Sequence, residues 1–276
     1  MSVTLNGQPL VEGVSAYDRG LHYGDGLFET IVCVKGRARF LSLHLERLSL
    51  GCERLHIALG DVEPLRAEIQ QAATAGDALI KVIVTRGEAV ARGYGWSGTE
   101  VATRLVYRYP LPPENVAARD GVRAVVATLR YGESPQLAGL KHLNRLEQVL
   151  ARSEVPVGDA AELLVFSSSG NLVSGTMSNV FLVRQGHVIT PKLDRCGVAG
   201  VMRRVVLREA AADGIHVEES VLSEAHLASA DEIFVTNARI GIWPIRTLGG
   251  RDIGVGPVTR RMQARLAALL EGAPDA

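Results

Sequence analysis

The sequence predicts an α+β protein built from two domains. The chain has 276 residues, of which 47% are hydrophobic, so it is long enough to bury a substantial core in one large domain or two modest ones. Short β-branched apolar runs alternate irregularly with segments whose apolar residues recur at helical spacing. The proline-rich segment 110–113 and the polar residues after it are typical of a linker. We therefore expect an N-terminal α/β domain over 1–109, a linker over 110–120 and a C-terminal α/β domain over 121–276.

The N-terminal half is expected to combine a hairpin, several strands and two helices. Leu45, Leu48, Cys52 and Leu55 recur on one helix face, which predicts a helix over 43–55. The expected elements of this half, in order, are a hairpin over 3–11, strands over 28–34 and 37–41, helices over 43–55 and 64–75, and strands over 80–85 and 101–109.

The C-terminal half repeats this mixture without an internal repeat. Leu143, Leu146, Val149 and Leu150 lie at helical spacing and predict a helix over 142–152. The other expected elements are strands over 123–129, 162–167, 180–184 and 232–237, and helices over 202–212 and 258–270.

Charge and cysteine content exclude several classes of protein. Thirty basic and thirty acidic residues balance without a long block of like charge, which argues against a nucleic-acid or anionic-membrane partner. The apolar runs are too short to span a bilayer, and the first seven residues show no basic segment leading into an apolar one. Cys33, Cys52 and Cys196 form no Cys-x-x-Cys pair, and the seven histidines lack metal-ligand spacing. We expect a cytoplasmic protein with core thiols and no metal.

Lys141 is the first candidate for chemistry, because the chain has only four lysines against twenty-six arginines. An ammonium group can lose its proton and attack a carbonyl, whereas a guanidinium stays charged, so the lysines are the candidates for Schiff-base chemistry. Lys35 and Lys192 lie in turn patterns, and Lys81 lies in an apolar strand where its charge can extend to an edge. Lys141 precedes a helical pattern, and a surface lysine beside a helix start is the alternative interpretation.

Four other segments carry weaker signals. Gly24-Asp25-Gly26 either lets the backbone approach a ligand or another chain, or is a plain tight turn. The glycine-spaced loop 197–200 opens a helix and suits a phosphate, although such loops are common. The segment 170–181 is predicted to form a strand, a crossing of small residues and another strand, and the small residues permit either close packing against a flat ligand or a core crossover. Arg47 is either a phosphate-binding residue or a helix-surface arginine.

Taken together, these segments in this order resemble the fold-type IV pyridoxal-phosphate enzymes, the group of branched-chain and D-amino acid aminotransferases and aminodeoxychorismate lyase. Residues 140–148 and 196–203 resemble the lyase branch specifically. The resemblance implies that Lys141 holds pyridoxal 5'-phosphate covalently. It also assigns roles in binding the cofactor or substrate; the cofactor set is Arg47, Ser174, Asn179, Gly200, Val201, Met202, Thr236 and Asn237, and the substrate set is Tyr23, Arg92 and Tyr107.

Ser174 departs from the family pattern. The family usually carries a glutamate five residues before the asparagine matched by Asn179, and that glutamate keeps the pyridine nitrogen protonated. A serine hydroxyl cannot supply this charge, so the ring becomes a weaker electron sink. Our hypothesis is that Ser174 disfavours transamination. The alternatives are that a nearby acid or a water replaces the missing group, or that activity is simply reduced.

The resemblance implies a lyase that converts 4-amino-4-deoxychorismate to 4-aminobenzoate and pyruvate, a step of folate biosynthesis. One alternative is a branched-chain or D-amino acid aminotransferase of the same fold, and another is a cofactor-free binding protein that has kept the scaffold. The resemblance also implies a homodimer with active sites near the subunit interface. The apolar strand 27–34 is a candidate for that interface.

Overall fold

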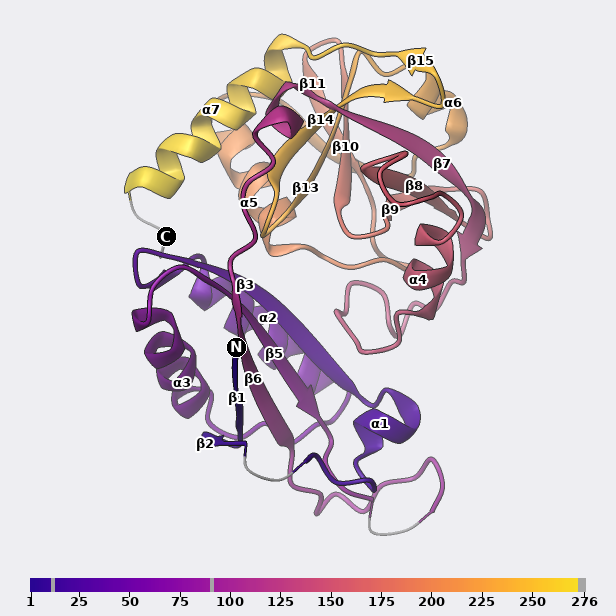
Figure 1. Cartoon of the computed structure of the whole chain (residues 1–276). Coiled ribbons are helices and arrows are strands. Elements are labelled where there is room, and N and C mark those ends of the chain that lie inside the picture. Colours follow the sequence, from indigo (N-terminus) through magenta and orange to yellow (C-terminus); the bar gives the residue numbers. More distant parts are fainter. Residues whose placement is uncertain (11–12, 90–91, 273–276) are drawn as a thin grey trace. The chain divides into compact units, whose positions relative to one another are not determined.

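The computed structural model describes residues 1–10, 13–89 and 92–272, which form two compact units (Figure 1). The first unit comprises Met1–Pro113 and Leu140–Asn144, and the second comprises Glu114–Gly139 and Arg145–Gly272. The chain thus leaves the first unit within the segment expected to be a linker. The second half of that segment forms a 3-10 helix, η1 (Val116–Asp120), in which Ala118 is buried against the core of the second unit.

An antiparallel six-stranded sheet organises the first unit. Its strands are ordered β2-β1-β6-β5-β3-β4. Their bounds are β1 (Ser2–Leu5), β2 (Gln8–Pro9), β3 (Gly26–Val34), β4 (Arg37–Ala38), β5 (Ala78–Thr85) and β6 (Thr103–Pro110). The expected strands 28–34, 80–85 and 101–109 are confirmed as β3, β5 and β6, with ends that differ by one or two residues. Of the expected strand 37–41, only β4 is extended, because Phe40 and Leu41 begin a helix.

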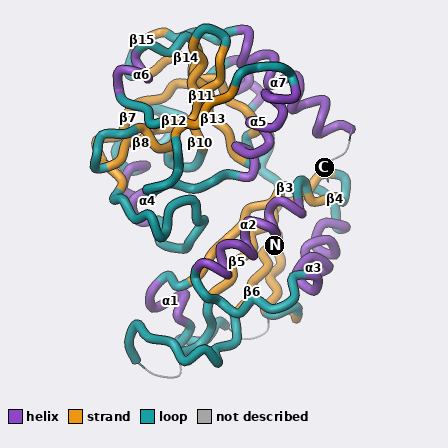
Figure 2. Tube along the Cα trace, turned by 180° about the vertical axis from the view of Figure 1, so that it is seen from behind, coloured by secondary structure: helices purple, strands orange, loops and turns teal. Residues whose placement is uncertain are grey.

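Helices α2 (Leu41–Arg54) and α3 (Glu63–Thr74) pack on this sheet (Figure 2). Leu45, Leu48 and Cys52 are buried, as their helical spacing predicted. The short helix α1 (Arg19–Tyr23) was not predicted, because five residues show no periodicity. It is instead defined by its ends, where Asp18 accepts a hydrogen bond from the Gly20 N–H and Gly24 ends the helix in the left-handed conformation.

Lys141 lies in an extended segment rather than beside a helix start. The Phe28 N–H donates to the Lys141 carbonyl at 2.9 Å, and the Leu143 N–H donates to the Gly26 carbonyl at 2.9 Å. The prediction of a helix from residue 142 is therefore wrong over its first four residues, because His142 and Leu143 pair with β3 before the helix begins. The helix that follows, α4 (Leu146–Arg152), begins after this pairing ends.

A nine-stranded mixed sheet organises the second unit, in the order β12-β11-β10-β13-β14-β7-β8-β9 with β15 paired to β14. The strand bounds are β7 (Val122–Tyr131), β8 (Glu162–Ser167), β9 (Leu172–Gly175), β10 (Asn179–Arg184), β11 (His187–Pro191), β12 (Val217–Ser220), β13 (Glu232–Asn237), β14 (Gly241–Leu248) and β15 (Arg251–Asp252). The remaining helices are α5 (Val201–Ala212), α6 (Glu224–Ala228) and α7 (Pro257–Gly272). The expected strands and helices of this half, other than the start of α4, are confirmed to within three residues.

Strand β3 is buried inside the first unit, which corrects the expectation that residues 27–34 form a subunit interface. Leu27, Ile31 and Val32 are each at most 3% exposed within the single chain. Cys33, on the same strand, and Cys52 are free buried thiols, and burial raises their pKa values to about 11 and about 12. Among the described residues, no helix combines the length and the apolar character needed to cross a membrane.

Candidate active site

Lys141 lies against the aromatic ring of Phe28 in the first unit. Its Nζ is 4.0 Å from the ring centroid, and the Nζ of Lys81 is 5.5 Å from the same centroid. Both ammonium groups are within cation–π range of one ring. The sequence predicted that Lys81 lies in an apolar strand and extends its charge to an edge, but β5 lies between β6 and β3, and Lys81 is on the half-buried face of the sheet.

Arg47 is held by a buried carboxylate rather than exposed on a helix surface. Its Nε donates to Glu29 Oε1 at 2.7 Å, and its Nη2 donates to Glu29 Oε2. His44 Nδ1 lies 2.6 Å from Glu29 Oε2, and because a carboxylate can only accept, this nitrogen carries the proton. Glu29, His44 and Arg47 therefore form one network between β3 and α2, which we call the Glu29 network.

The charges of the Glu29 network follow from its burial. Burial would raise the pKa of Glu29, but the Arg47 guanidinium and the His44 ring outweigh it and hold the pKa at about 2. Burial lowers the pKa of His44, and the positive charges of Arg47 and Lys141 lower it further against the opposing effect of Glu29. His44 is therefore neutral at neutral pH, and its Nε2 is buried without a hydrogen-bond partner among the described residues.

The three residues expected to bind substrate occupy two places in the first unit. Tyr107 lies on β6 directly opposite Lys81 of β5, and burial and the neighbouring Tyr109 raise its pKa. Tyr23 ends α1, where its ring lies 5.4 Å from the ring of Tyr94. Arg92 is exposed in the loop that carries Tyr94. The structure thus brings Tyr23 to the Arg92 loop, and Tyr107 to Lys81.

In the second unit, the loop 197–200 opens helix α5 as predicted. Gly200 is its N-cap in an extended conformation, and no acidic residue lies in the first turn. The first N–H groups of a helix have no partner inside it and lie at its positive end, so they suit an anion. The Asn179 amide donates to the Val198 carbonyl at 2.8 Å. A Cβ added to Gly200 would lie 2.1 Å from Asn179 Oδ1, so only glycine fits this cradle.

Thr236 and Asn237 lie at the end of β13, and Thr236 pairs directly with Asn179. The Thr236 hydroxyl is buried and donates to the Gly241 carbonyl, so it can donate to a phosphate only by giving up that bond. The Asn237 amide donates to the Met177 carbonyl at 3.0 Å, and its Oδ1 accepts from Arg239 and Ile240 N–H groups. Both side chains thus shape the backbone around Asn179.

Ser174 is buried on β9, and its hydroxyl donates to the Gly175 carbonyl at 2.8 Å. The nearby acid is Glu162, a fully buried residue that sequence reasoning did not single out. Its carboxylate accepts from the Thr176 N–H at 2.9 Å and from the Ser178 hydroxyl at 2.6 Å. Glu162 therefore holds the turn between Ser174 and Asn179, and the signal in the sequence was one acid beginning an apolar strand.

Known proteins are similar to this chain in sequence and in fold. A family model described as amino-transferase class IV matches residues 26–248. This chain belongs to the class IV aminotransferase family. Aminodeoxychorismate lyase from Vibrio harveyi is 34% identical over 95% of this chain and 98% of its own. A putative branched-chain-amino-acid aminotransferase from Methanocaldococcus jannaschii is 30% identical over 96% and 95%. The crystal structure of 4-amino-4-deoxychorismate lyase from Pseudomonas aeruginosa is 42% identical, with a TM-score of 0.92 over 99% of this chain and 100% of that one.

This class IV enzyme depends on pyridoxal phosphate, and its residues fit that cofactor. In the first unit, Lys141 has an amine that could react with the cofactor aldehyde, and Arg47 has a guanidinium that could bind the cofactor phosphate. In the second unit, the first turn of α5 has backbone N–H groups that could bind an anion. Gly200, the N-cap residue, leaves space there that a Cβ would fill. An amine for the aldehyde and cationic or N–H donors for the phosphate are the groups that the cofactor requires.

Proposed function

We propose that this class IV enzyme is an aminodeoxychorismate lyase, which releases 4-aminobenzoate and pyruvate from 4-amino-4-deoxychorismate. The observation that carries the proposal is the 42% identity with the Pseudomonas aeruginosa lyase over 99% of the chain. The putative aminotransferase from Methanocaldococcus jannaschii named above is 30% identical to this chain. The product 4-aminobenzoate places the reaction in folate biosynthesis.

Lys141 is the catalytic residue of this proposal. The cofactor, when bound, supplies an electron sink for the carbon that carries the substrate amine. The Lys141 amine removes the proton from C4, the bond between C3 and the enolpyruvyl oxygen breaks, and the ring becomes aromatic. The resulting Lys141 ammonium returns a proton to the departing enolpyruvate, which becomes pyruvate. Phe28 lies beside this amine, with its ring centroid 4.0 Å from Nζ, and so helps to orient the Lys141 side chain.

The remaining residues bind and orient in this proposal. Arg47 and the N–H groups of Gly200, Val201 and Met202 bind the cofactor phosphate, and Asn179 holds the loop that presents these groups. Ser174, Thr236 and Asn237 act indirectly, because their side-chain hydrogen bonds shape the backbone that lines the cofactor. Arg92 pairs with a substrate carboxylate, since a guanidinium binds it through two parallel hydrogen bonds. Tyr23 and Tyr107 complete the substrate contacts.

The deciding experiment adds 4-amino-4-deoxychorismate to the cofactor-loaded protein without any keto acid and follows both products. We expect equal and repeated formation of pyruvate and 4-aminobenzoate, and no turnover in a Lys141→Ala variant. If pyruvate is absent and amino acids convert the cofactor to its amine form, the protein is an aminotransferase instead. A protein that stays colourless after addition of pyridoxal phosphate would be a binding protein.

The proposal includes a cytoplasmic homodimer. Three apolar side chains on one face of α4, those of Leu146, Val149 and Leu150, are 57–76% exposed in the single chain. They follow the spacing i, i+3 and i+4, so they form one stripe, and a second subunit is the partner that we propose for it. The three free cysteines accord with a reducing compartment.

A further inference from the structure

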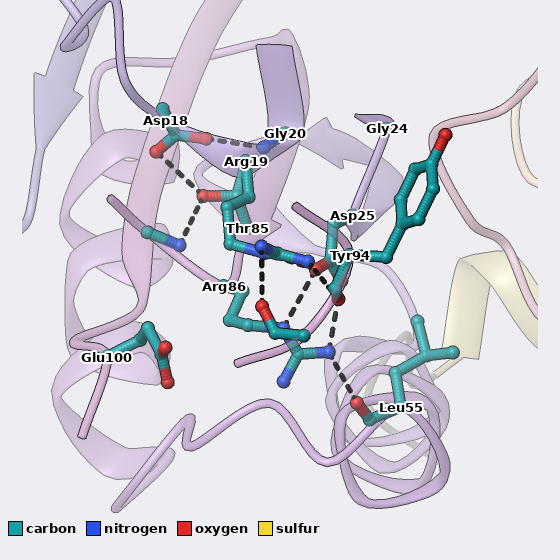
Figure 3. A network of polar contacts seen from close by, with 12 residues as sticks. Asp18, Arg19, Gly20, Gly24, Asp25, Leu55, Thr85, Arg86, Tyr94 and Glu100 are labelled. Carbon is teal, nitrogen blue, oxygen red and sulfur yellow. Dashed lines mark hydrogen bonds and ion pairs between the residues drawn. The ribbon is translucent and has the colours of Figure 1, made fainter. Parts of the chain in front are cut away.

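The loop that carries Arg92 is tied to the first unit by a buried arginine from a distant part of the sequence. Arg19 Nη1 donates to the carbonyls of Gly93 and Gly95, both at 3.1 Å. Its Nη2 donates to the carbonyl of Tyr94 at 2.9 Å, and Figure 3 shows Arg19 beside Tyr94 and Asp25. Among hydrogen bonds between described residues, these three are the ones that connect residues 93–95 to the rest of the unit. One planar guanidinium thus fixes three consecutive peptide units.

Arg19 is itself held from its other side by Asp25. Its Nε donates to Asp25 Oδ2 at 2.9 Å, and Arg86 donates to the same carboxylate through Nε at 2.8 Å and Nη2 at 3.1 Å. Burial would raise the pKa of Asp25, but these hydrogen bonds and charges lower it, so the carboxylate stays ionised. Arg86 also donates to the carbonyls of Leu55 and His56, both at 2.7 Å, which fixes it to the end of α2.

The backbone of Arg19 is equally constrained. Its N–H donates to the Gly87 carbonyl at 2.8 Å. Asp18 caps α1 and accepts from the Thr85 hydroxyl at 2.9 Å. A Cβ on Gly20 would lie 2.3 Å from Thr85 Cγ2, so α1 sits directly on the end of β5. A Cβ on Gly26 would likewise lie 2.4 Å from the Val84 carbonyl oxygen, so Gly20 and Gly26 both permit close packing within the chain.

The loop presents its side chains outward from this anchor. Tyr94 is 83% exposed although its carbonyl is held by Arg19, and Arg92, which precedes the anchored carbonyls, is also exposed. The Arg19 guanidinium carbon lies 4.9 Å from the centroid of Tyr23, a residue expected to contact substrate. Arg19 therefore connects Tyr23 with the loop of Arg92.

We propose that Arg19 is a positioning residue for substrate binding, which fixes the 92–95 loop so that its side chains are held in place before the substrate arrives. The inference rests on the proposed function, in which this loop meets a substrate carboxylate. A lysine cannot replace Arg19, because an ammonium is a point donor and cannot span three carbonyls and a carboxylate as the guanidinium fork does. Pre-fixing a loop removes the ordering cost that binding would otherwise carry.

The test compares Arg19→Lys with Arg66→Lys, an arginine on α3 that pairs with Glu63 and lies far from the loop in sequence. We expect the KM of Arg19→Lys for 4-amino-4-deoxychorismate to rise roughly tenfold to hundredfold, the range for a misplaced binding group. Its kcat and its affinity for pyridoxal phosphate should stay near those of the wild type, because Arg19 touches neither Lys141 nor the Glu29 network among the described contacts. Arg66→Lys should change none of these quantities.

Limited trypsin digestion gives a readout that does not depend on turnover. Cleavage after Arg92 should be faster in Arg19→Lys than in the wild type, and low concentrations of guanidinium should restore both the KM and the cleavage rate of Arg19→Ala. A KM and a cleavage rate that stay at the wild-type values in Arg19→Lys overturn the proposal, and so does a KM that rises only together with loss of the cofactor.

An Arg92→Gln variant separates the two proposals. If its KM is unchanged while that of Arg19→Lys rises, the loop acts through another of its residues, so the assignment of Arg92 fails and the role of Arg19 stands. If the wild type does not convert 4-amino-4-deoxychorismate, the proposed function fails, and the same comparison with an amino acid and a keto acid then decides the role of Arg19.

Discussion

Glu29 shows how a single residue sets the charges around it. Its carboxylate is enclosed by β3 and α2, binds Arg47 through two donors, and fixes the proton of His44 on Nδ1. Nothing in the sequence distinguishes Glu29, because an acid in an apolar strand is as often a surface residue. Its role depends on partners fifteen and eighteen residues away, and only the packing of α2 on the sheet brings them together.

Replacing Glu29 by glutamine should destabilise the protein by about 3 kcal/mol, the low end for removal of one partner from a buried ion pair. The amide has no charge to balance Arg47, whose side chain is only 16% exposed. Urea unfolding measures the loss, and Glu53→Gln, at an exposed position of α2, is the matched control. Equal unfolding midpoints for the two variants would show that Arg47 does not need this partner.

Stability should fall in two steps as the pH is lowered. The pKa of His44 is lowered from 6.5 in the folded state, so below pH 6.5 the unfolded chain binds the proton more readily and stability declines. The pKa of Glu29 falls from 4.5 to about 2, so the same reasoning gives a second decline between these values. Urea midpoints on either side of pH 6.5 should differ less in His44→Gln than in the wild type.

Ser174 is the residue that should separate the lyase from its transaminating relatives. A Ser174→Glu variant supplies a carboxylate that favours a protonated pyridine nitrogen, so transamination of amino acids should rise by roughly tenfold, the effect of about 1.4 kcal/mol on a barrier. Ser168→Glu, at an exposed serine of the preceding turn, is the control. Transamination that stays at the wild-type rate in Ser174→Glu would count against our hypothesis.

At the scale of elements, the spacing of apolar residues predicted the long helices correctly. It did not show which other element each segment pairs with or packs against. Helices α2, α3, α5 and α7 follow their predicted ranges because each has a buried stripe. The same pattern failed at residues 142–145, because the periodic signal in Leu143 and Leu146 does not show that β3 offers a backbone partner first. Short elements are too short to show a periodic pattern: α1 is defined by its caps, and β15 is defined by its pairing with β14.

The N-terminus of α5 should lose its phosphate site when Gly200 gains a side chain. In Gly200→Ala the new Cβ collides with Asn179 Oδ1, so either the first turn of α5 or the asparagine must move. We expect the affinity for pyridoxal phosphate to fall by about tenfold or more, since the N–H groups no longer converge on one anion. Titration of the cofactor into the apoprotein measures this, with Gly272→Ala, where a Cβ meets no atom within 4 Å, as the control.

At the scale of the whole molecule, an exposed apolar stripe on a helix requires a partner. If the stripe of α4 lies in a homodimer, light scattering should give twice the 29.6 kDa mass of the chain. Leu150→Glu should then shift the protein to the monomer, because a charge is costly to bury in such a contact. Val221→Glu, at an isolated exposed valine, should not. A wild-type monomer would remove the dimer from our proposal.

The return of Leu140–Asn144 to the first unit ties the completion of that unit to the order of protein synthesis. A ribosome delivers Met1–Pro113 first and then Glu114–Gly139, which belongs to the second unit. Until Leu143 emerges, the N–H of Phe28 and the carbonyl of Gly26 lack their native partners, and one edge of β3 stays open. The nascent first unit is therefore unfinished until Leu143 has been made, and the step that closes its sheet also delivers Lys141 to the ring of Phe28.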